Sequence, residues 1–160
     1  GVQPPHAGTG NERGMPITYD AVKALSADLY DWSLRAVPAE VSAGATTLTL
    51  EVEAWRSFQP TMDSVENRLI AILRVNAAGG GVPGALAVDT VWLVHGSEVV
   101  QGGAREEQSR EPGASSVEFV LRDGPMWAPG ASIEVVALVS GVNGRTATLR
   151  APRIVIERVD

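Results

Sequence analysis

Strict alternation of apolar and polar side chains is the feature that most limits the folds open to this 160-residue chain. Between positions 47 and 54 (TLTLEVEA), apolar residues fill the even positions and Thr or Glu the odd ones. The segments 117–122 and 133–139 carry similar apolar sets at every second position. Because successive side chains of a strand point to opposite faces, this period of two predicts half-buried antiparallel strands.

Turn-forming residues separate these segments from others of the same kind, and Gly96-Ser97 and Asp123-Gly124-Pro125 are examples. Short strands with such turns between them are typical of a β-sandwich. The predicted strands are 30–37, 47–54, 68–75, 86–95, 98–100, 117–122, 133–139, 145–150 and 154–159. Pro152 has no N–H to donate, so the last segment is either a continuation past a bulge or a separate edge strand.

The alternation also predicts which side of each strand is buried. Trp92 has inward parity with Val88 and Val94, which places it in the core. Ile70 and Ile72 lie opposite the inward set of their strand, so we expect something to cover its outer face.

We therefore predict an all-β fold, a two-sheet antiparallel β-sandwich of about seven to nine strands, formed by residues 19–160 as one domain. Residues 1–18 are rich in Pro, Gly and polar residues and have little to bury, which predicts a flexible leader. Apolar residues recur at helical spacing from Tyr19 to Trp32, which favours a short helix near 20–27. The apolar residues alternate from Tyr30 to Val37, so we favour a turn or short helix over 20–27 followed by the first strand.

The segment from Val37 to Gly44, followed by a long alternating strand, resembles the entry into immunoglobulin-like or fibronectin type III-like modules. The closing hairpin, from 133 to 150, is similar to the last two strands of such modules. The resemblance is one of pattern and points to no specific family. It implies a module that binds, spaces or docks, since most such domains are not enzymes.

Composition excludes several classes of function. The net charge of −6 and the isoelectric point of about 4.9 oppose binding to nucleic acid, and the basic residues are scattered. The chain has no cysteine, which removes disulfides, thiolate metal sites and cysteine nucleophiles. No apolar run approaches the roughly 20 residues that span a bilayer. We expect no cofactor and no metal.

Three loop residues are candidates for binding. Phe58 and Met62 are apolar residues in the polar loop 57–66, where they would form a docking patch or cap the end of the sandwich. Trp127 lies between prolines, where its indole would contact a sugar or protein, or else plug the core. Trp55 has outward parity and is a fourth candidate, exposed or in contact with the segment 19–32.

Catalytic and metal-binding patterns are weak. His95 lies at a predicted strand end, and Glu98 across the following turn is its nearest acidic partner in sequence, which suggests a proton-transfer pair or a simple turn contact. The loop carboxylates Glu106, Glu107 and Glu111 would bind calcium weakly or form a solvated charged run. No phosphate loop or nucleophile elbow occurs.

These observations rank three functions. The first is a noncatalytic extracytoplasmic module that binds a protein, or a glycan as the second choice, through Phe58, Met62, Trp127 and Trp55. The second is a structural or spacer domain of a secreted protein or bacterial lipoprotein, tethered to a membrane upstream of this chain. The third is an enzyme with an unfamiliar site near His95.

Overall fold

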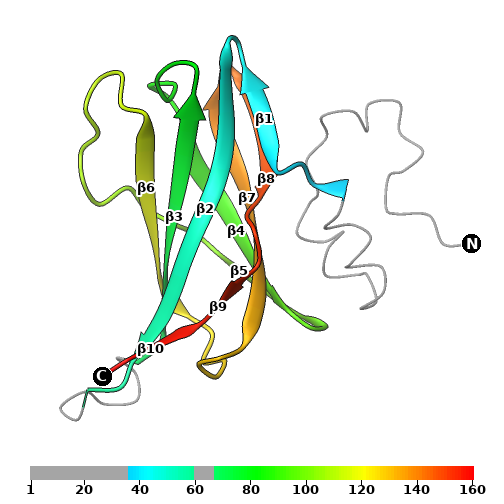
Figure 1. Cartoon of the computed structure of the whole chain (residues 1–160), viewed down its shortest axis with the longest axis vertical. Coiled ribbons are helices and arrows are strands. Elements are labelled where there is room, and N and C mark those ends of the chain that lie inside the picture. Colours follow the sequence, from blue (N-terminus) through cyan, green and yellow to red (C-terminus); the bar gives the residue numbers. More distant parts are fainter. Residues whose placement is uncertain (1–35, 60–66) are drawn as a thin grey trace, which may run out of the picture.

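The computed structural model describes residues 36–59 and 67–160, and this part of the chain forms ten β-strands without a helical element (Figure 1). The strands are β1 (Glu40–Ala43), β2 (Thr46–Ser57), β3 (Leu69–Ala78), β4 (Ala87–His95), β5 (Glu98–Gly102), β6 (Ser116–Gly124), β7 (Ser132–Val142), β8 (Arg145–Arg150), β9 (Ile154–Val155) and β10 (Glu157–Val159). The predicted leader, the helix near 20–27 and most of the predicted strand 30–37 lie outside the described residues. The end of that strand is wrong, because Ala36 and Val37 belong to no strand.

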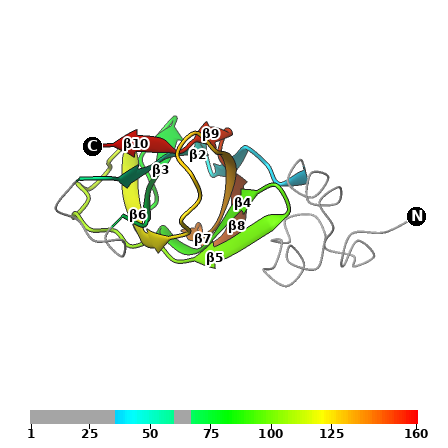
Figure 2. The same cartoon turned by 90° about the horizontal axis from the view of Figure 1, so that it is seen from below.

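The strands form two sheets, which confirms the predicted all-β sandwich. Sheet 1 has the order β1-β2-β3-β6, with β10 also paired to β2, and sheet 2 has the order β5-β4-β7-β8, with β9 also paired to β7. The β10–β2 pair is parallel and the other strand pairs are antiparallel. The strands surround the core when the molecule is seen from below (Figure 2). β1, β2 and β3 share one sheet, whereas the third strand of an immunoglobulin constant-type domain lies in the second sheet.

The core between the sheets is built from the inward set of each alternating strand. Leu48 and Leu73 of sheet 1, and Leu93 and Val135 of sheet 2, are fully buried. Burying one side chain of this size contributes about 1.5–3 kcal/mol. A shift of register by one residue would turn such a set toward solvent, so the alternation specifies both the strands and their pairing.

The last residues of the chain close one side of the sandwich. After Pro152, β9 pairs with β7 of sheet 2, and β10 then pairs with β2 of sheet 1. Ile156, between the two strands, is 1% exposed, and its N–H donates to the carbonyl of Ala131. The sequence left two alternatives for the segment 154–159, a continuation of β8 or a separate strand. The structure shows that the segment is separate from β8 and crosses from one sheet to the other.

A β-bulge in β4 corrects the predicted position of Trp92. Val88 pairs with Val139 and Thr90 pairs with Leu138, so Asp89 is an extra residue in the strand. An extra residue reverses the alternation after it.

The inward residues of β4 beyond the bulge are accordingly Val91 and Leu93, and Trp92 points to the outer face of sheet 2. Trp92 is still buried, at 2% exposure, in a second apolar cluster with Val37 and Val136. Its Nε1 has no hydrogen-bond acceptor in the part of the chain that the structure describes. The predicted burial is thus correct, but the predicted face is wrong.

Arg110 ties together two loops at the upper end of the sandwich in Figure 1. Its guanidinium donates to the carbonyls of Pro83 and Leu86, at 3.1 and 2.7 Å, and to both carboxylate oxygens of Glu106. Glu107 of the same loop pairs with Arg122. Two of the three carboxylates of the predicted charged run, Glu106 and Glu107, are thus engaged by arginines.

Gly141 makes the closest backbone approach in this region: its φ is 73°, and a Cβ added there would overlap the carbonyl oxygen of Ala85. Gly144 has a φ of 79°, but a Cβ added there would meet no other atom. We expect Gly144→Ala to lower the free energy of unfolding by about 1–2 kcal/mol, because of the left-handed backbone alone. Gly141→Ala should cost a further ~1–3 kcal/mol from overpacking. Urea denaturation of both variants measures the difference, and equal costs would contradict the close approach.

Acid should weaken the ion pair between Arg110 and Glu106. The hydrogen bond from Arg110 lowers the pKa of Glu106 below its ordinary value of 4.5. A carboxyl group whose pKa is lower in the folded state stabilises the fold above the unfolded pKa, and this contribution is lost as pH falls through the folded pKa. We therefore expect Glu106→Gln to reduce the loss of stability below about pH 4.5. Thermal melts across acidic pH test this, with Glu111→Gln of the same loop as control; an equal reduction in the control would contradict it.

Candidate functional site

Two of the four predicted binding residues meet at the lower end of the sandwich. The end of β2, the β4–β5 hairpin, the β6–β7 loop and the C-terminus gather there (Figure 1). We call this region the lower end and define it by residues 56–59, 95–98, 124–131 and 156–160. It contains Phe58 and Trp127, whereas Met62 lies outside the described residues.

Arg56 is the residue that organises the lower end. It continues the inward set of β2, after Val52 and Ala54, and is only 7% exposed. Its guanidinium donates to the carbonyls of Met126 and Trp127, at 3.2 and 3.0 Å. It also donates to the backbone carbonyl and the side-chain oxygen of Asn67, at 2.9 and 3.2 Å. One buried cation therefore holds the β6–β7 loop against the start of β3.

Phe58 is held between two guanidinium groups. The Cζ atoms of Arg56 and Arg158 lie 4.8 and 4.3 Å from the centre of its ring. Cation–π contacts of this kind contribute about 0.5–2 kcal/mol each. The backbone N–H of Phe58 donates to the carbonyl of Val159 at 2.7 Å. The ring is half-buried, so Phe58 is a fixed, partly open aromatic surface.

Trp127 is fixed through its indole N–H. Nε1 donates to Oε2 of Glu98 at 2.9 Å, and the ring lies 5.4 Å from that of His95, tilted by 46°. The side chain is half-buried and packs against the core. Trp127 therefore combines the two predicted alternatives, because one part of it seals the core and another part stays accessible.

His95 and Glu98 lie opposite each other in the β4–β5 hairpin, as the sequence suggested. Nδ1 of His95 is 3.1 Å from the carbonyl oxygen of Ser132, and a carbonyl can only accept, so Nδ1 carries the proton in this contact. The carboxylate of Glu98 accepts from Trp127 instead of from His95. Both groups thus position the β6–β7 loop.

Apolar side chains are exposed beside these fixed rings. Met126 is 47% exposed, and Val159 is 40% exposed. The sequence analysis missed Met126, Arg158 and Arg56. The parity of β2 does place Arg56 inward, which is the one signal that would have identified it, because a charged residue in an inward position needs several hydrogen-bond partners.

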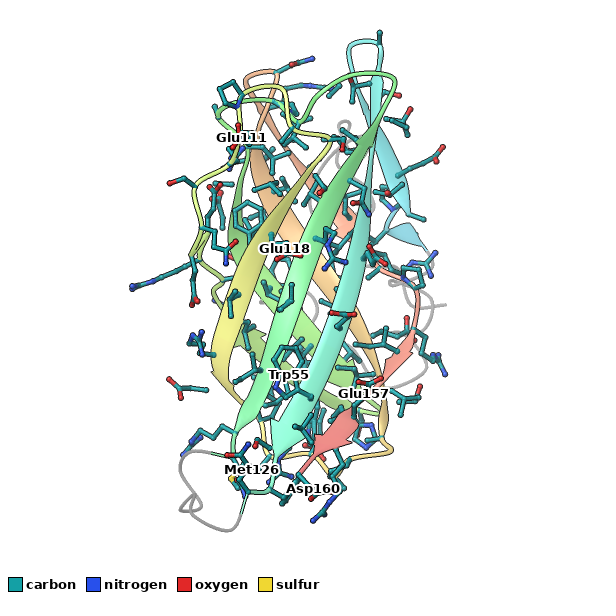
Figure 3. The ribbon with its side chains drawn as sticks, turned by 60° about the vertical axis from the view of Figure 1, so that its left-hand side comes forward. Trp55, Glu111, Glu118, Met126, Glu157 and Asp160 are labelled. Carbon is teal, nitrogen blue, oxygen red and sulfur yellow. The ribbon has the colours of Figure 1, made fainter. Side chains whose placement is uncertain are left out.

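Trp55 lies apart from the other candidates. It points to the outer face of sheet 1, opposite to Arg56, and is paired with Ile70 of β3. Figure 3 shows it on the lower half of that face, next to Glu157. The structure therefore brings Phe58 and Trp127 together through Arg56 and places Trp55 on a different surface.

Within residues 36–59 and 67–160, no group of three or more His, Asp or Glu side chains is arranged to hold a metal ion. The described part of the chain also holds no helix of the length and apolarity needed to cross a membrane.

Comparison with known proteins identifies no family. No family model matches the chain, and no curated protein matches it. A crystal structure of a protein named ApaA from Bordetella pertussis aligns with 76% of this chain and 97% of its own, with 15% identity and a TM-score of 0.41. A likeness of this extent carries no conclusion about fold or function.

Replacing Arg56 should loosen the lower end. Arg56→Met would leave the carbonyls of Asn67, Met126 and Trp127 without their donor, and we expect a loss of about 2–4 kcal/mol in the free energy of unfolding. Arg153→Met is the control, because Arg153 is 64% exposed in its pair with Glu134 and should cost less than about 1 kcal/mol. Chemical denaturation measures both, and equal costs would contradict the role of Arg56.

Proposed function

We propose that this domain is a noncatalytic, extracytoplasmic interaction module that binds a protein through its lower end. The observation that supports this most directly is the exposure of Met126 and Val159, whose backbone carbonyls accept hydrogen bonds from Arg56 and Phe58, respectively. Exposed apolar side chains around a rigid aromatic anchor, with arginines at the border, are the composition of a protein-binding surface. The adaptable side chain of Met126 suits such contacts.

A protein is favoured over a glycan by the surroundings of Trp127. Stacking on a sugar needs an open indole face, but Trp127 packs on the core and lies against the ring of His95. Its N–H is already bonded to Glu98 and is not free to donate to a sugar hydroxyl. Met126 and Val159 add apolar area without hydrogen-bonding groups, which favours a protein surface.

A structural or spacer domain is the second candidate. It is favoured by the half-buried state of Phe58 and Trp127 and by the internal contacts that hold both. In this reading the lower end only closes the sandwich. The immunoglobulin-like assignment and the attachment to a secreted protein or lipoprotein belong to the proposal in both cases.

Photocrosslinking in the cell of origin tests the proposal. With p-benzoylphenylalanine in place of Met126, we expect one discrete adduct with a protein, which an excess of the unmodified chain removes. The same group in place of Glu111, exposed at the upper end, should give no such adduct. Adding Val159→Asp to the Met126 variant should reduce the adduct severalfold, because it places a charge in the apolar surface.

Identical adducts from both positions, or none from Met126, would favour the spacer. The folded state of each variant is checked by its thermal unfolding midpoint, because Met126 and Val159 are exposed and their replacement should leave the fold intact.

A further inference from the structure

The outer face of sheet 1 carries an apolar patch that the lower end does not include. Trp55 and Ile70 are cross-strand partners, and Ile72 is paired with Val120 of β6. All four side chains are half-buried on the outer face, where the sequence predicted that β3 would be covered. Above the patch, Arg74 is hydrogen-bonded to Glu51 and Glu118, at 3.0 and 2.9 Å (Figure 3).

Charge is distributed unequally across this face. At the level of Ile72 the strand pairing gives one row of side chains, in which Glu53 is followed by Ile72, Val120 and Arg105. Paired residues of neighbouring strands point to the same face, so the two charges lie on the same surface as the apolar residues. The row spans three strand spacings of about 4.8 Å, or roughly 14 Å.

Two further exposed charges lie beside this row. Glu157 lies next to Trp55 on the acidic side, because β10 pairs with that end of β2. Arg122 lies on the basic side, in β6, and is 57% exposed in its pair with Glu107. Glu118 of β6 is paired with Arg74 on the same face, so the asymmetry is carried by the row from Glu53 to Arg105, with apolar residues between the two charges.

We propose that this face binds a second copy of the same chain to form a two-fold symmetric dimer. A two-fold axis that runs along the strands between β3 and β6 places Glu53 of each copy opposite Arg105 of the other. It also places Ile72 opposite Val120, so that the apolar patches meet. An isologous contact of this kind is self-complementary, and each residue pair occurs twice.

The size of the face limits the strength of such a contact. The ten residues of β3 span about 34 Å at 3.4 Å per residue, and the row width adds roughly 14 Å before side chains are counted. These dimensions give a flat area of roughly 480 Å², below the about 800 Å² per partner of a standard interface, so we expect a weak dimer. Because each chain carries a net charge of −6, the apolar contact provides the attraction and the charged rows set the register.

Charge reversal tests the dimer without disturbing the core. The full chain should sediment as a dimer at micromolar to millimolar concentration in analytical ultracentrifugation. Glu53→Arg alone, or Arg105→Glu alone, should sediment as a monomer, because each places like charges opposite each other twice. An equimolar mixture of the two variants should restore the dimer, because each altered row then meets a row of opposite charge.

Glu111→Arg is the control, since it changes the net charge by the same amount at the upper end and should leave the dimer intact. A monomeric full chain throughout this range, a dimer in both reversal variants, or a mixture that stays monomeric would each overturn the proposal. If the full chain stays monomeric, the face binds a different protein or another segment of this chain. Crosslinking at Met126, in the β6–β7 loop, probes a different surface, so these results leave that test of the lower end unaffected.

Discussion

The fold depends on one constraint, which is that alternate side chains of each strand are removed from water between two facing sheets. In β2 this constraint acts over the whole strand, so that Leu48 is fully buried while Glu51 is exposed. The same parity brings Arg56 inward at the end of the strand. At the end of β2, the inward position is filled by Arg56 instead of an apolar residue. Its guanidinium donates to several carbonyl oxygens, and these hydrogen bonds hold the lower end together.

The second requirement of a sandwich is to protect its edges, because an unpaired strand edge invites association. Here β9 and β10 pair along one side, and Arg105 bridges to Val120 beyond β6 on the other. Arginines add to this closure, since Arg110 joins two loops of the upper end and Arg150 donates to the carbonyl of Val37. Such pairing covers part of the edges of the sandwich, and β5 keeps an open edge among the described strands.

The sequence predicted the sandwich, because the period of two in segments such as 47–54 and 133–139 is a direct result of burial on one side. It did not predict the face of Trp92, because the bulge at Asp89 arises from pairing with β7 and leaves the local pattern unchanged. It placed Phe58 and Trp127 in loops but did not predict that Arg56 contacts both, since that contact depends on how the two loops meet in the fold. The partition of strands between the sheets was likewise not predicted, because alternation carries no information on which strands are neighbours.

The parallel pairing of β10 with β2 also affects how the protein can be handled. Because Val159 is hydrogen-bonded to Phe58, the chain leaves the fold at Asp160 beside the lower end. An affinity tag or fusion partner joined at the C-terminus would therefore lie next to Met126 and obstruct that surface. Immobilisation for binding measurements is better made through the β7–β8 hairpin at the opposite end, where Asn143 and Gly144 are exposed.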